Sequence, residues 1–124
     1  MQQKGRILVV EENDLILRLL ERWLGDEGYT VVAGNSQSLG QEVGEGEEPE
    51  LVIIDIPTPR NAEKTIKSAR EVHAGPILLL SARFRRGTGS SISVAHQLGV
   101  RNVLPKPFTR DELLSAVSES INGR

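Results

Sequence analysis

The chain has 124 residues, of which 38% are hydrophobic and 26% charged, and its net charge is −2. This length suits one domain, which we expect to span residues 1–124, alone or as a fragment of a longer protein. The absence of cysteine excludes disulfides and thiolate chemistry, and the slightly acidic balance argues against direct nucleic-acid binding. Without a signal-peptide pattern or an apolar run of roughly 20 residues, we expect a soluble, cytoplasmic domain with no membrane contact.

Short apolar runs and helical patterns alternate through the first half of the chain. The apolar runs are rich in β-branched residues and too short for helices, so they predict buried strands. Apolar residues spaced three and four apart predict one clear helix, which Asn13 or Asp14 would cap. The expected order is a strand at 6–10, a helix at 15–24, a strand at 29–33, a weak helix at 35–47 and a strand at 51–54.

The second half continues the alternation. Thr109 and Glu112 have the spacing of a capping box, which predicts the start of the last helix. The expected order is a helix at 61–73, a strand at 77–80, a helix at 90–98, a strand at 101–104 and a final helix with Leu113, Leu114, Val117 and Ile121 on one face. Five strand–helix units predict an α/β fold, a (βα)5 parallel sheet covered by helices on both faces.

Polar side chains follow four of the predicted strands, at the edge where open α/β sheets bind their ligands. Glu11 and Glu12 follow the first strand and Asp55 the third. Three clustered carboxylates would repel one another unless they share a cation. Mg2+ fits better than zinc, because no histidine or cysteine lies at these strand ends.

A hydroxyl and an ammonium complete the same edge, because Ser81 follows the fourth strand and Lys106 the fifth. A phosphoryl group would suit this set, since the cations neutralise its oxygens and the hydroxyl donates a hydrogen bond. Asp55, at the end of the most apolar strand, is then placed to accept the phosphoryl group as an acyl phosphate.

At these positions the sequence resembles the response-regulator receiver domains of two-component signalling, the chemotaxis-type phosphoacceptor domains. The resemblance covers residues 6–121 and depends on four motifs found in order at the expected strand ends. They are residues 7–12 ending in Glu11 and Glu12, residues 51–55 ending in Asp55 with Pro59 four positions later, residues 80–82 around Ser81, and residues 104–108 around Lys106.

The resemblance implies a flavodoxin-like, doubly wound sheet with strand order 2-1-3-4-5. It implies that a histidine kinase or phosphotransfer protein phosphorylates Asp55, with Ser81 and Lys106 engaging the phosphoryl group. Magnesium would be held by Glu11, Glu12, Asp55 and the backbone carbonyl of Pro57, and a cis peptide bond would precede Pro107. A downstream effector or a fused output domain would read the change, and a homodimer stays an open alternative. Such a domain is not a turnover enzyme and catalyses at most its own phosphorylation and dephosphorylation.

Three residues depart from the family pattern. Glu12 stands where the family usually has aspartate, and Val103 stands where it usually has a tyrosine or phenylalanine that changes rotamer on activation. Pro57 leaves no polar side chain two residues after Asp55, which also disfavours an aspartate-nucleophile phosphatase. These departures motivate an alternative function, a phosphorylation-independent receiver-like protein-interaction module.

Charge is divided unevenly along the chain. The net charge is −7 over residues 1–62 and +5 over residues 63–124. The segment at residues 83–89 contributes three arginines, which form either a solvated loop or an anion or partner contact. We expect the positive balance to mark a partner-binding face formed by the fourth helix, fifth strand and fifth helix.

Overall fold

A computed structural model describes residues 5–11, 13–34, 49–55, 75–81, 100 and 102–122, with the backbone alone for Ser81 and Pro105. Its elements are β1 (Arg6–Val10), α1 (Asp14–Asp26), β2 (Thr30–Gly34), β3 (Leu51–Asp55), β4 (Ile77–Ser81), β5 (Asn102–Pro105) and α5 (Arg110–Asn122). Every predicted strand is present, with its bounds shifted by one residue at most. The helices expected at 35–47, 61–73 and 90–98 lie outside the described residues.

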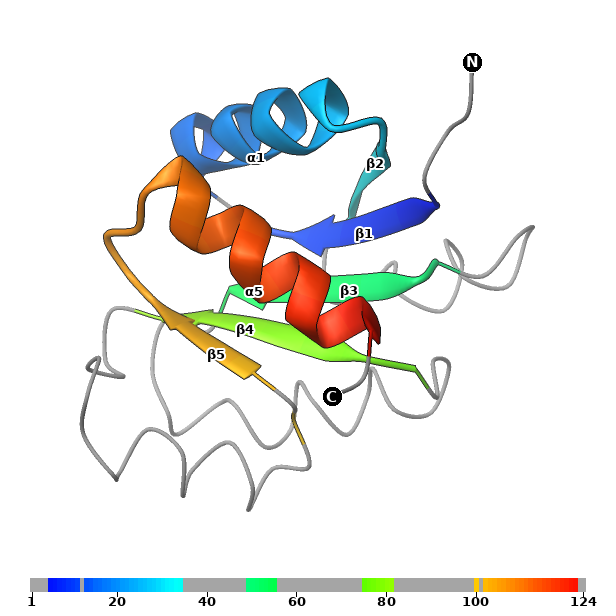
Figure 1. The fold of residues 1–124 in the computed structure, drawn as a ribbon. Helices are drawn as coiled ribbons and strands as arrows, with labels where there is room; N and C mark the ends of the chain where they lie inside the picture. The colour runs from blue at the N-terminus through cyan, green and yellow to red at the C-terminus, as the bar shows by residue number, and fades with distance from the viewer. Residues whose placement is uncertain are drawn as a thin grey trace.

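The five strands form one parallel sheet in the order β2-β1-β3-β4-β5, which confirms the order 2-1-3-4-5 (Figure 1). The register aligns the carboxyl ends of the strands. Val10 of β1 pairs with Ile54 of β3, and Asp55 pairs with Leu80 of β4. Glu11 after β1, Asp55 at the end of β3 and Lys106 after β5 therefore meet at one edge of the sheet.

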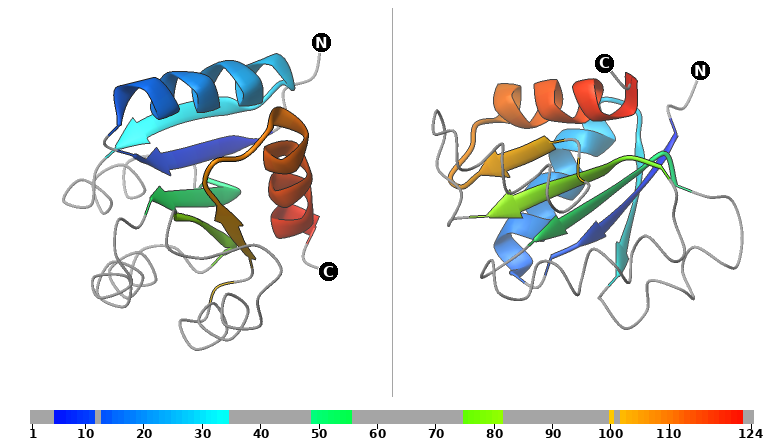
Figure 2. Two further views of the ribbon diagram at one scale, coloured as in Figure 1. Left: turned by 90° about the vertical axis from the view of Figure 1, so that its left-hand side faces the viewer. Right: turned by 90° about the horizontal axis from the view of Figure 1, so that it is seen from below.

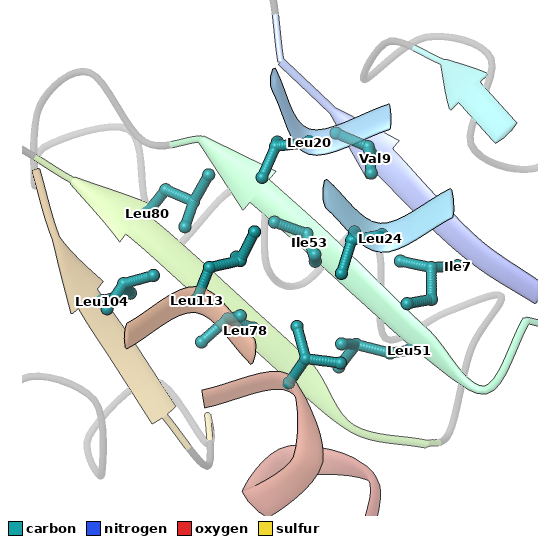
Figure 3. Close-up of a cluster of buried hydrophobic side chains, with 11 residues drawn as sticks. Ile7, Val9, Leu20, Leu24, Leu51, Ile53, Leu78, Leu80, Leu104 and Leu113 are labelled. Carbon is teal, nitrogen blue, oxygen red and sulfur yellow. The ribbon is translucent and has the colours of Figure 1, made fainter. Parts of the chain in front are cut away.

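Helices α1 and α5 cover one face of this sheet (Figure 2). Their buried leucines pack onto strand side chains that alternate toward them, as expected for period-two strands. This cluster contains Ile7, Val9, Leu20, Leu24, Leu51, Ile53, Leu78, Leu80, Leu104, Leu113 and Val117 (Figure 3). The alternate residues of the central strands are also buried, which fits a sheet enclosed on both sides.

Both helices begin with the side-chain caps that the sequence predicts. The Asn13 Oδ1 accepts a hydrogen bond from the Ile16 N–H at 3.2 Å, so Asn13 is the N-cap of α1. At α5, the Thr109 hydroxyl accepts from the Glu112 N–H at 3.1 Å, and the Glu112 carboxylate accepts from the Thr109 N–H at 2.9 Å. This reciprocal pair is the expected capping box, and it fixes the start of α5 four residues after Lys106.

Candidate functional site

The Lys106 ammonium lies between two carboxylates that come from different strands. Its Nζ is 2.5 Å from Asp55 Oδ1 and 3.3 Å from Glu11 Oε1. The sequence predicts all three residues at the same sheet edge, and the parallel register brings them together there. The chain turns away from this edge directly after Lys106, through the expected cis peptide bond to Pro107.

Glu11 is the more enclosed of the two carboxylates. Its side chain is 1% exposed, whereas the side chain of Asp55 is 16% exposed and that of Lys106 18%. The backbone N–H of Asn13 donates a hydrogen bond to Glu11 Oε2 at 3.1 Å, so each carboxylate oxygen of Glu11 has a donor. Asp55, by contrast, is partly open to solvent and accessible to an incoming group.

Burial raises the pKa of Glu11, and the nearby Asp55 charge raises it further. The Asn13 N–H and the Lys106 ammonium act in the opposite direction, but they do not cancel the loss of hydration. The site therefore holds an excess of negative charge over the one cation, Lys106, that its described residues supply. A second cation at this edge would relieve the repulsion between Glu11 and Asp55.

Glu11 and Asp55 both direct carboxylate oxygens toward the Lys106 ammonium. Carboxylate oxygens are ligands that magnesium prefers, so the donor chemistry of the described site fits this ion. Two carboxylates alone do not make a complete ligand set, and the described residues contain no group of three or more histidine, cysteine or acidic side chains placed to hold a metal. The other expected ligands, Glu12 and Pro57, lie outside the described residues.

Ser81 ends β4 beside the strand that carries Lys106, and its backbone pairs in register with Pro105. The Ser81 side chain, whose hydroxyl is expected to engage a phosphoryl group, lies outside the description. Val103 is half-buried in β5. The family resemblance leads us to expect an aromatic ring at this position, and β5 carries valine there instead.

Two contacts at the site have no direct sequence signal. The first is the hydrogen bond that the Asn13 N–H donates to Glu11. The only sequence sign of it is that Asn13 lies two residues after Glu11, at the end of a strand. Trp23 of α1 packs edge-to-face on Phe108, with ring centroids 6.4 Å apart. Trp23 is half-buried and packs against the core cluster on the apolar face of its helix.

Comparison with known proteins gives a family match over most of the chain. Residues 7–118 match the family model of the response regulator receiver domain. The chain is 27% identical over 114 residues to the transcriptional regulatory protein CpxR of Escherichia coli, covering 91% of this chain and 47% of that protein. It is 32% identical over 122 residues to the transcriptional regulatory protein PdtaR of Mycobacterium tuberculosis, covering 94% of this chain and 57% of that protein. The chain thus spans about half the length of these curated relatives.

Solved structures show the same fold. A response regulator from Thermotoga maritima superposes with a TM-score of 0.82 at 22% identity, over 97% of this chain and 99% of that one. The receiver domain of a sensor histidine kinase from Pseudomonas aeruginosa has a TM-score of 0.69 at 24% identity, covering 96% of this chain and 98% of that one. That structure is described with a magnesium ion coordinated in its active site cleft. In the described part of the present chain, neither helix is long and apolar enough to cross a membrane.

Proposed function

The chain belongs to the response regulator receiver domain family, and on that premise we propose that Asp55 accepts a phosphoryl group and thereby switches the binding of a partner. The observation that carries the proposal is the position of Lys106, whose ammonium contacts Asp55 while also pairing with buried Glu11. A cation held against the acceptor carboxylate can compensate the negative charge that phosphorylation adds.

In the proposed reaction, a carboxylate oxygen of Asp55 attacks the phosphorus of a phosphohistidine on the donor protein. The bond between phosphorus and the histidine nitrogen breaks, the bond between phosphorus and the Asp55 oxygen forms, and the imidazole takes up a proton. Lys106 keeps its charge throughout and turns from the carboxylate of Asp55 toward an oxygen of the new phosphoryl group. Glu11 holds the Lys106 ammonium at this edge during that change.

Magnesium supplies further neutralisation of the transferring group's oxygens when it is bound. We propose that Glu11, Glu12, Asp55 and the Pro57 carbonyl hold it, with Glu11 and Asp55 supported by their placement around one ammonium. Glu12 would offer its carboxylate from a side chain one methylene longer than that of aspartate. Ser81 would donate its hydroxyl hydrogen bond to the phosphoryl group from the end of β4.

The partners implied are a histidine kinase or phosphotransfer protein as the donor and an effector or output domain as the reader of the phosphorylated state. The relatives' names describe transcriptional regulators, which supports a role in signalling rather than in substrate turnover. The alternative, a module that works without phosphate, is less favoured, because the Lys106 ammonium contacts both Asp55 and Glu11 and such an arrangement would serve phosphoacceptor chemistry.

Incubation with acetyl phosphate and Mg2+, followed by intact mass measurement, tests the proposal. The wild-type chain should gain the mass of one phosphoryl group, and Asp55→Asn should gain none. Asp14→Asn is the matched control, because Asp14 is an exposed carboxylate in the first turn of α1 and its loss should leave the gain intact. An unmodified wild type would contradict the proposal and favour the phosphate-independent module. An equal gain in Asp55→Asn would also contradict it, because the phosphoryl group would then lie on another residue.

A further inference from the structure

An aromatic contact ties the segment that carries Lys106 to helix α1. Phe108, two residues after Lys106, packs edge-to-face on Trp23 of α1, with the ring centroids 6.4 Å apart and the ring planes at 68°. Both rings are half-buried and pack against the hydrophobic core of the sheet. The chain has only four aromatic residues, so two of the four meet beside the lysine of the candidate site.

This contact joins the middle of the segment to a separate helix. Residues 106–109 lie between β5 and α5 and belong to neither element. Before the segment, the backbone of Pro105 pairs in register with Ser81. At its far end, the capping box of Thr109 and Glu112 connects the segment to the first turn of α5, but these hydrogen bonds are local to that helix. The Phe108 ring is what fixes the backbone after Lys106 to α1.

Helix α1 also contacts the site through its N-cap. The Asn13 N–H donates a hydrogen bond to Glu11 Oε2, while Glu11 Oε1 lies 3.3 Å from the Lys106 ammonium. Asn13 and Trp23 are ten positions apart, which is about 15 Å along the helix axis. One rigid helix therefore holds Glu11 from its start and the Phe108 ring from its second half, so both sides of the Lys106–Glu11 pair are referred to the same element.

The Lys106 ammonium needs such support. Its side chain has a long, flexible stem and is 18% exposed, so rotamer preferences alone do not hold the charge in one place. A shift of the backbone that carries Lys106 would move the ammonium relative to Asp55. The rate of a group transfer depends steeply on placement of this kind, so the contact that fixes this backbone bears on the chemistry.

An ion pair makes a second connection between the same region and the end of α1. Arg110 Nη2 lies 3.6 Å from Glu27 Oε2, and the two side chains are 47% and 37% exposed. Water and salt screen an ion pair that is this open, so it should add little to the position of the segment. The aromatic contact, which packs against the core, is the stronger of the two connections.

We propose that Trp23 is a positioning residue of the phosphoacceptor site, which acts through Phe108 to hold the Lys106 ammonium against Asp55; this rests on the function proposed for Asp55. Trp23 acts at one remove from the chemistry. Its ring holds the Phe108 ring, the backbone of Phe108 holds that of Lys106, and the Lys106 ammonium meets the phosphoryl group. Loss of the Trp23 ring should slow phosphoryl transfer in a chain that is still folded.

The first test measures the rate of phosphorylation by acetyl phosphate at saturating Mg2+, from intact masses, at a temperature where circular dichroism shows every variant to be folded. Trp23→Leu and Phe108→Leu should each lower the rate about threefold to tenfold. The double variant should be no slower than the slower single variant, because the two rings act as one contact. Trp23→Phe keeps a ring that can pack on Phe108, so its rate should stay within about twofold of the wild type.

Two further readouts separate positioning from a loss of packing. The Mg2+ concentration that gives half the maximal rate should be the same in Trp23→Leu and the wild type, because the ring acts on Lys106 and not on the metal ligands. Without phosphodonor or Mg2+, Lys106→Met should change the fluorescence emission of Trp23, since the released segment would let Phe108 shift. Arg18→Met, which removes an exposed cation from α1 itself, should leave that emission unchanged.

Two variants serve as controls for the rate. Arg110→Met removes the exposed ion pair with Glu27, and Leu19→Ala removes an exposed apolar side chain from α1; both should keep the wild-type rate. Wild-type rates in folded Trp23→Leu and Phe108→Leu, additive losses in the double variant, a shifted Mg2+ midpoint or an unchanged emission in Lys106→Met would each overturn the role of Trp23 while leaving that of Asp55 intact. A wild type that gains no phosphoryl group would contradict the proposed function itself, and the role of Trp23 with it.

Discussion

The ammonium of Lys106 lies 2.5 Å from Asp55 Oδ1 and also reaches Glu11, which connects β5 to β3 and β1 at one edge of the sheet. Lys106 is thus both the cation beside the proposed phosphoacceptor and the described partner that offsets a nearly fully buried carboxylate. Changes at this position should affect the stability of the fold as well as its chemistry.

Replacing Lys106 with methionine should lower the free energy of unfolding by about 1–3 kcal/mol at neutral pH. The reason is that Glu11 and Asp55 would then repel each other without their shared cation. Urea denaturation measures the change. The control is Arg110→Met, which removes an exposed ion pair with Glu27 and should cost at most about 0.5 kcal/mol. Equal costs for the two variants would show that Lys106 does not offset the buried charge.

The raised pKa of Glu11 predicts a pH dependence with a definite sign. A carboxyl group whose folded pKa lies above its unfolded value favours the folded state when protonated, so its contribution falls as pH rises above about 4.5. Glu11→Gln should therefore gain stability relative to the wild type as pH is raised from that value toward neutrality. Urea midpoints across this window measure the difference. Exposed Glu21→Gln should show no such trend, and a parallel trend in both variants would rule out Glu11 as its source.

Tyr29 is the one tyrosine of the chain, so its ionisation can be followed by ultraviolet absorbance without a signal from another tyrosine. Burial raises the pKa of Tyr29, and the charges of Glu50 and Glu27 raise it further. The titration midpoint should lie above that of free tyrosine, and Glu50→Gln should lower it in part, since burial is the larger cause. Stability should fall as pH rises through this ionisation. A midpoint at or below the free value would contradict the packing of Tyr29.

The contact between Trp23 and Phe108 predicts a spectroscopic and a thermodynamic effect. Phe108→Leu should keep an apolar side chain but remove the ring pair, changing the fluorescence of the single tryptophan and costing about 1 kcal/mol. Leu19→Ala is the control, because Leu19 is 43% exposed on the same helix and should leave the emission of Trp23 unchanged. The same spectrum in Phe108→Leu and wild type would mean that the rings do not touch in solution.

The sequence predicts the sheet and the meeting of Glu11, Asp55 and Lys106 because each follows an apolar run, and parallel strands bring such ends together. It also predicts the caps of α1 and α5, since capping depends on local spacing. It does not predict that Lys106 pairs with both carboxylates, because side-chain geometry across three strands has no local signal. The sequence does not predict the Trp23–Phe108 contact for the same reason, since that contact depends on packing between distant segments.

The most direct test of the central claim identifies the residue that carries the phosphoryl group. Borohydride reduces an aspartyl phosphate to homoserine, so protein treated with acetyl phosphate and Mg2+ can be reduced, digested and mapped by mass spectrometry. We expect homoserine at position 55 in the wild type treated with the phosphodonor, and none in untreated protein. An intact Asp55 in a phosphorylated chain, with homoserine at another aspartate, would contradict it.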